Sequence, residues 1–168
     1  MLHWPKRPNM RRISVVLAMS FICGSAYAVD PGRAQGSMTI DSSRVDLNYA
    51  YAIDHQANDV THRKDDRRVV LSDKPFPEGF KLEEIDNGFP DGVFGIVICI
   101  SRVDKVTHVL LQHAKGMYDA SYFEEDPNYT FKPLKGEPGT VAGNVSSKKV
   151  RTNTMSFAFD VDFNATIH

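Results

Sequence analysis

Residues 154–167 read TMSFAFDVDFNATI, a stretch in which apolar and polar side chains alternate. A strand turns successive side chains to opposite faces, whereas a helix repeats every 3.6 residues and cannot separate residues in this way. The segment therefore predicts a long strand with one face in the core and one in water. The core face carries Phe157, Phe159, Val161 and Phe163, and the water face carries Asp160, Asp162 and Asn164.

Similar patterns lie upstream. Residues 37–41 alternate, residues 41–43 favour a turn, and residues 44–53 place Val45, Leu47, Tyr49, Tyr51 and Ile53 at odd positions. This arrangement predicts a β-hairpin whose second strand keeps all its bulky groups on one face.

The run from Val93 to Val103 is apolar on both faces, which is typical of a central strand covered on both sides. Cys99 lies within it and is predicted to be a buried, inert residue. Asp104 and Lys105 predict a tight turn, after which residues 106–114 return as the partner strand.

These patterns predict an all-β chain, a single-domain antiparallel β-sandwich or barrel of roughly seven to nine strands. At most one short helix is expected, near residues 80–86, with Gly88 as its C-cap. The expected organisation is a signal peptide at 1–28, a flexible lead-in at 29–35 and a single β domain at 36–168.

The first 28 residues have the features of a cleavable export signal. Four basic residues, Lys6, Arg7, Arg11 and Arg12, precede an apolar run from Ile13 to Cys23. That run is too short to cross a bilayer, which needs roughly 20 residues. Ala26 and Ala28 then supply the small side chains that signal peptidase requires. The sequence therefore predicts a periplasmic or secreted chain beginning at Val29.

Removal of this leader changes the charge. The whole chain has 20 Lys+Arg and 21 Asp+Glu, and the leader contains four of the basic residues and no acidic one. The mature chain would thus carry 16 basic and 21 acidic residues, a net charge of −5. Such a balance argues against nucleic-acid binding. No membrane insertion of the mature chain is expected, and Cys99 would be its single cysteine.

Aromatic residues are dense between residues 118 and 131, where turn residues are also frequent. Aromatic side chains near turns line ligand clefts and protein interfaces, and they also cap the ends of β cores. The candidate ligand- or partner-binding residues are Tyr118, Tyr122, Phe123 and Tyr129.

Other polar clusters match no known ligand spacing. The group His55, Asp59, His62, Asp65 and Asp66 is interpreted as a solvated loop, and so is the acidic group Asp119, Glu124, Glu125 and Asp126. His108 and His113 are five residues apart, so a strand would place them on opposite faces. The sequence predicts no metal site, no cofactor and no catalytic constellation.

Several short stretches resemble a family of uncharacterised exported bacterial β-rich proteins. The likeness rests on GSMTID at 36–41, VDLNYAYA at 45–52, VVLSDKP at 69–75, VAGNV at 141–145 and the closing alternating strand. The family has no assigned function, so the resemblance implies export and a β-rich domain and transfers no catalytic residue.

The expected function is the binding of a small ligand or a partner protein by an exported, soluble β domain. One alternative is an enzyme that uses His108 or His55 as its acid or base. A second alternative is a structural envelope protein without a ligand. A pocket with convergent polar groups would favour ligand binding.

Overall fold

The computed structural model describes residues 29–54, 67–121 and 126–168. In these residues the chain is all-β, as the alternating patterns predicted. The strands are β1 (Arg33–Ile40), β2 (Ser43–Asp54), β3 (Arg67–Ser72), β4 (Gly95–Ile100), β5 (Val106–His113), β6 (Gly116–Ser121), β7 (Tyr129–Leu134), β8 (Thr140–Ser147), β9 (Val150–Arg151) and β10 (Ser156–Ile167). One 3₁₀ helix, η1 (Leu82–Asn87), ends at the predicted C-cap Gly88.

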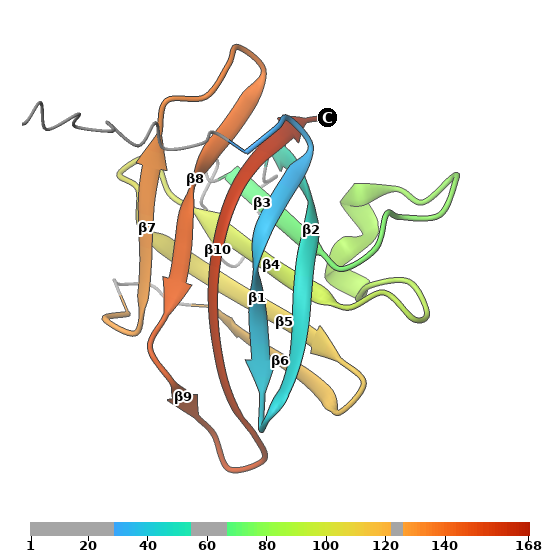
Figure 1. Ribbon diagram of the computed structural model, residues 1–168, viewed down its shortest axis with the longest axis vertical. Coiled ribbons are helices and arrows are strands. Elements are labelled where there is room, and N and C mark those ends of the chain that lie inside the picture. The colour runs from blue at the N-terminus through green and yellow to red at the C-terminus, as the bar shows by residue number, and fades with distance from the viewer. Residues whose placement is uncertain (1–28, 55–66, 122–125) are drawn as a thin grey trace, which may run out of the picture.

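The strands form one sheet in the order β6-β5-β4-β3-β2-β1-β10-β8-β7, with β9 paired to β10. The sheet curls into a half-barrel, so that β1, β2 and β10 cross in front of β3 to β6 (Figure 1). Neighbours are antiparallel, but the end of β10 runs past the start of β1 and pairs in parallel with β2 at Thr166–Tyr51 and Ile167–Ala52. None of the described helices is long and apolar enough to span a membrane.

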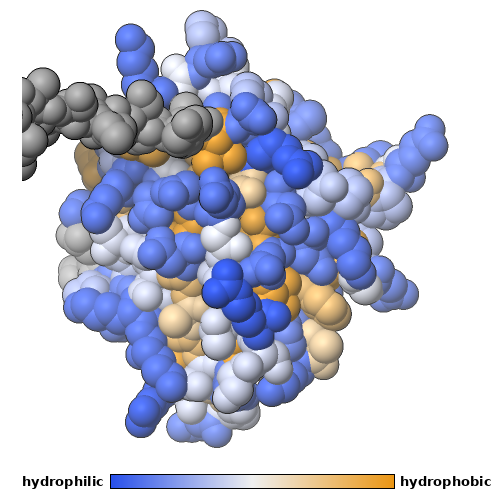
Figure 2. Space-filling model, in the orientation of Figure 1, coloured by the Kyte–Doolittle hydropathy of each residue, from blue (hydrophilic) through white to orange (hydrophobic). Residues whose placement is uncertain are grey.

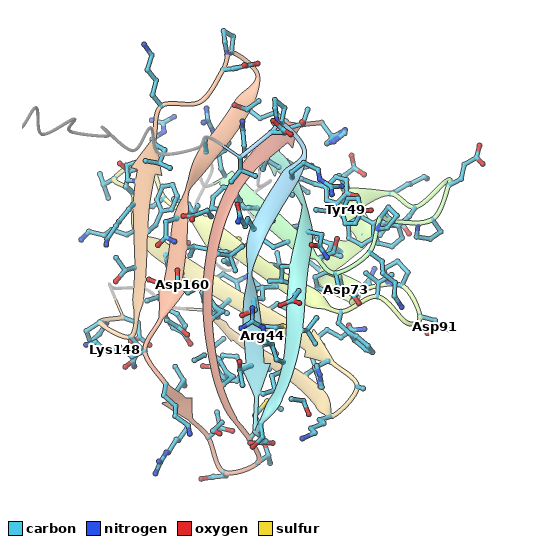
Figure 3. All side chains as sticks on the ribbon, in the orientation of Figure 1. Arg44, Tyr49, Asp73, Asp91, Lys148 and Asp160 are labelled. Carbon is cyan, nitrogen blue, oxygen red and sulfur yellow. The ribbon has the colours of Figure 1, made fainter. Side chains whose placement is uncertain are left out.

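The inside of the curl is filled by apolar side chains from every long strand. In β10, Phe157, Phe159, Val161 and Phe163 are at most 3 % exposed, whereas Asp160 and Asp162 are exposed. The predicted division of this strand is therefore confirmed at these positions. The outer surface of β1, β2 and β10 is mainly hydrophilic (Figure 2), and Asp160 lies on it (Figure 3).

The start of the described chain is more ordered than expected. Residues 29–35 were predicted to be a flexible lead-in, but β1 already begins at Arg33. Gly32 N donates to the Asn164 carbonyl at 2.7 Å, and the Asn164 amide donates to the Val29 carbonyl at 2.9 Å. Asn164 is therefore buried beneath this segment instead of facing water.

Strand β2 also departs from the prediction. Between the pairs Arg33–Tyr49 and Gly36–Leu47, β1 contains one residue more than β2. Such a bulge shifts the register and turns over the side chains that follow. Leu47 and Ala50 consequently face the core, while Tyr51 packs against an outer cluster. The prediction that all bulky residues of this strand share one face is wrong.

Residues 73–94, including η1, cover part of the outer face of β3 to β5, at the side of the sheet (Figure 1). Their second apolar cluster contains Val70, Ile85, Phe89, Val93, Val97 and Leu110. The side-chain amide of Gln112 on β5 fixes this segment to the sheet. It accepts a hydrogen bond from Phe89 N at 2.9 Å and donates one to the Phe89 carbonyl at 3.2 Å. The prediction that the strand is buried on both faces is confirmed for Gly95–Ile100. It is wrong for Val103, which lies beyond β4 in the following loop and is 72 % exposed.

Candidate functional site

The aromatic residues selected from the sequence do not gather at a surface cleft. Tyr129 is 5 % exposed and stacks with Phe159 inside the core. Tyr118 is partly buried against the same core, with its ring 4.7 Å from that of Phe157. Both side chains thus serve packing. Tyr122 and Phe123 lie outside the described residues.

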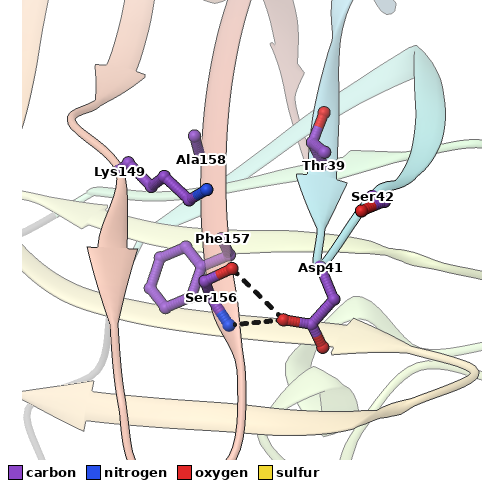
Figure 4. Close-up of a pocket in the computed structure, with 7 residues that line it drawn as sticks. All are labelled: Thr39, Asp41, Ser42, Lys149, Ser156, Phe157 and Ala158. Carbon is purple, nitrogen blue, oxygen red and sulfur yellow. Dashed lines mark hydrogen bonds between the residues drawn. The ribbon is translucent and has the colours of Figure 1, made fainter.

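A pocket lies instead on the outer face, where the β1–β2 turn meets the start of β10 (Figure 4). Its volume is about 340 Å³, which falls at the lower end of the range for small-molecule sites. The lining residues are Thr39, Asp41, Ser42, Lys149, Ser156, Phe157 and Ala158. Space remains above Ala158 because its side chain is a single methyl group.

A local irregularity of the sheet places Lys149 beside this hollow. Between the pairs Asp160–Ser146 and Phe157–Val150, β10 has two residues and the opposing chain has three. The extra residue breaks the ladder between β8 and β9, and Lys148 N donates to the Asn128 carbonyl instead. The Lys149 side chain extends across β10 toward Ala158 (Figure 4).

Asp41 fixes the opposite side of the pocket. Its Oδ1 accepts hydrogen bonds from Ser156 N at 2.8 Å and from Ser156 Oγ at 3.2 Å. The hydrogen bond from the Ser156 backbone lowers the pKa of Asp41. Burial opposes this effect, and the Ser156 hydroxyl, Lys115 and Lys149 reinforce it. The turn residues Asp41 and Ser42 both have positive φ, 52° and 134°. Asp41 therefore acts as a clip between the hairpin turn and β10.

The pocket combines a cation with hydroxyl groups. Lys149 contributes an ammonium, and Thr39, Ser42 and Ser156 contribute hydroxyls around Ala158. The Asp41 carboxylate lines the same pocket, and the charges of Lys149 and Lys115 help to lower its pKa. This arrangement favours a small anionic group that also accepts hydrogen bonds.

A second polar group lies on the outer face of β4, β5 and β6, beyond the end of the apolar cover. His108 Nε2 lies 2.6 Å from Asp119 Oδ1, and His108 Nδ1 lies 3.8 Å from Cys99 Sγ. Cys99 is buried, as predicted, and Asp119 is a strand residue instead of part of a solvated acidic loop. The three residues lie on different strands, and no local pattern in the sequence indicates their contact.

The register of the β4–β5 hairpin brings this group together. A two-residue turn at Asp104 and Lys105 would place Leu110 opposite Cys99. The observed loop is longer, with Ser101 N donating to the Lys105 carbonyl, and a bulge follows it. His108 is consequently the cross-strand partner of Cys99. Bulges frequently re-aim side chains beside active sites.

The other polar residues singled out from the sequence lie apart from the Lys149 pocket and from the His108 group. His113 packs against Phe94 with ring centroids 5.3 Å apart, on the other face of β5 from His108, as expected. Burial lowers the pKa of His113, and Lys115 adds to this effect. Asp126 caps a turn by accepting from Asn128 N. The described residues contain no group of three or more His, Cys, Asp or Glu side chains placed to hold a metal ion.

The polar group of residues 55–66, with His55, Asp59, His62, Asp65 and Asp66, lies outside the described residues, as do Glu124 and Glu125. No protein-family model, curated protein or solved structure matches the chain.

Proposed function

We propose that this chain is an exported, single-domain protein that binds a small anionic ligand in the Lys149 pocket. The observation that carries the proposal is that one ammonium and three hydroxyl groups line a hollow of about 340 Å³, beside an Asp41 carboxylate that is already hydrogen-bonded to Ser156. A charged donor strengthens a hydrogen bond to an anion, and the hydroxyls would orient it. The negative balance of the mature chain supports a small ligand over nucleic acid, as does the limited size of the positive site.

Binding is favoured over catalysis at this place. The seven lining residues include no histidine or cysteine, and the Asp41 oxygen that accepts from Ser156 is engaged in holding the turn. A structural envelope protein would need no such pocket. Of the histidines considered as an acid or base, His55 lies outside the described residues, and His108 belongs to a different surface.

Export is supported by the basic leader, the short apolar run and the small residues Ala26 and Ala28. The resemblance to exported β-rich proteins points the same way. The Val29 carbonyl accepts a hydrogen bond from the Asn164 side chain, so Val29 belongs to the folded β domain. N-terminal sequencing of secreted protein should begin at Val29, and a mature chain that retains residues 1–28 would refute the proposed processing.

Ligand binding can be tested by NMR titration with sodium citrate at constant ionic strength, with chloride as the screening control. We expect saturable shifts at residues around the pocket. Lys149→Gln should weaken citrate at least about 5-fold, or ~1 kcal/mol. Lys148→Gln is the matched control, because Lys148 is adjacent and exposed but does not line the pocket. Equal affinities for the two variants, or shifts identical with citrate and chloride, would refute the site.

A further inference from the structure

Asp119, His108 and Cys99 form a connected row across three strands. His108 Nε2 lies 2.6 Å from Asp119 Oδ1. Because an ionised carboxylate can only accept hydrogen bonds, this contact requires a hydrogen on His108 Nε2. The neutral imidazole then keeps its lone pair on Nδ1, 3.8 Å from Cys99 Sγ. A base beside a thiol, oriented by a third group, is the arrangement of an activated nucleophile.

The neighbour on the other side of Cys99 is also basic. Arg68 is the cross-strand partner of Cys99 on β3. Its side chain is 6 % exposed, and its Nη2 pairs with Asp86 Oδ2 of η1 at 2.9 Å. Cross-strand partners hold their Cβ atoms about 5 Å apart. Arg68 therefore borders Cys99 on β3, with its guanidinium paired to the carboxylate of Asp86.

Exposure decreases along the row, from 54 % for the Asp119 side chain to 18 % for His108 and 2 % for Cys99. Asp119 on β6 is thus the exposed end of the row, and Cys99 is its buried end. A thiol this buried favours reaction with the smallest reactants over bulky disulfides and peptides. Among common oxidants of thiols, hydrogen peroxide meets this size limit.

We propose that Cys99, His108 and Asp119 form a thiol centre that is oxidised by small hydroperoxides, separate from the Lys149 pocket. Cys99 would then be buried but not inert, in contrast to the expectation from its apolar neighbours. His108 Nδ1 accepts the thiol proton, and the sulfur attacks one peroxide oxygen. The O–O bond breaks, and the leaving oxygen takes the proton from His108 and departs as water or an alcohol. Sulfur loses two electrons and becomes a sulfenic acid, while the peroxide gains two. Asp119 is a positioning residue, because it acts through His108.

The test uses the full chain with Cys23→Ser, so that Cys99 is the single thiol whether or not the leader is removed. The protein is exposed to hydrogen peroxide at pH 7, the reaction is stopped with catalase, and the remaining thiol is titrated after denaturation. Thiol loss should be at least about 10-fold faster in the folded protein than in guanidinium, consistent with general-base assistance. Intact mass should show the gain of one oxygen. A bulky disulfide reagent should react slowly with the folded protein.

Variants separate the roles of the two partners. His108→Gln should slow peroxide oxidation at least about 10-fold, and Asp119→Asn should slow it less while shifting its pH midpoint. The titratable and charged groups of this row and its neighbours are Arg68 of β3 with its partner Asp86 of η1, His108 of β5 and Asp119 of β6.

His113→Gln is the matched control, because it changes a histidine of the same strand on the other face, and its rate should equal that of the parent. Lys148→Gln, an exposed change outside both sites, should also react at the parent rate. Denaturation midpoints verify folding, and Asp119→Asn, at an exposed position, serves if His108→Gln fails to fold. The proposal is overturned if peroxide oxidises the folded protein no faster than the unfolded chain. It is also overturned if His108→Gln and Asp119→Asn both keep the oxidation rate and pH profile of the parent protein.

Discussion

Replacing Phe159 by alanine should lower the free energy of unfolding by about 4 kcal/mol, within the range for buried Phe→Ala substitutions. Phe159 is 3 % exposed and stacks with Tyr129. Loss of the buried ring removes ~2 kcal/mol of transfer free energy. A residual void of ~80 Å³, at about 24 cal/mol per Å³, adds ~2 kcal/mol.

The neighbouring Asp160→Asn is the matched control, because Asp160 lies on the opposite, exposed face of β10. Its side chain accepts a hydrogen bond from Asn144, which asparagine can retain through its amide oxygen. The change should be below about 0.5 kcal/mol. Urea denaturation of both variants at pH 7 measures the two values. Similar losses, or a larger loss for Asp160→Asn, would show that the alternation does not separate core from solvent.

Two further substitutions test close contacts. Gly95→Ala should destabilise by about 3 kcal/mol, the upper part of the range for overpacking, because the new methyl carbon would lie 2.1 Å from the Leu71 carbonyl and 2.5 Å from the Phe89 ring; a urea-measured loss below about 1 kcal/mol would contradict this contact. Asp41→Asn should flatten the pH dependence of stability in acid. The folded pKa of Asp41 is lowered from 3.8 by its bond from Ser156, so its contribution is present above pH 3.8 and is lost as pH falls through the folded value; identical pH–stability curves for parent and variant would refute the clip.

Local pattern was sufficient for the elements whose faces follow from their own residues. The alternation of β10 and the two apolar faces of β4 were predicted, because a strand has a period of two and burial follows hydrophobicity. The pattern failed in β2, where a bulge against β1 turned Tyr51 outward. It also failed at Asn164, which is buried by the segment beginning at Val29. Both errors come from partners that are distant in the sequence.

The candidate sites required tertiary information almost entirely. Alternation determined that Cys99 is buried, but it carried no indication that His108 lies opposite, because the hairpin register depends on a loop and a bulge. The Lys149 pocket joins a turn near residue 41 to strands more than 100 residues later. Sequence by itself determined an all-β chain with a polar and an apolar face on its last strand, and predicted an export signal. Only the tertiary structure decided which polar groups meet, since cross-strand register and bulges arise from non-local pairing.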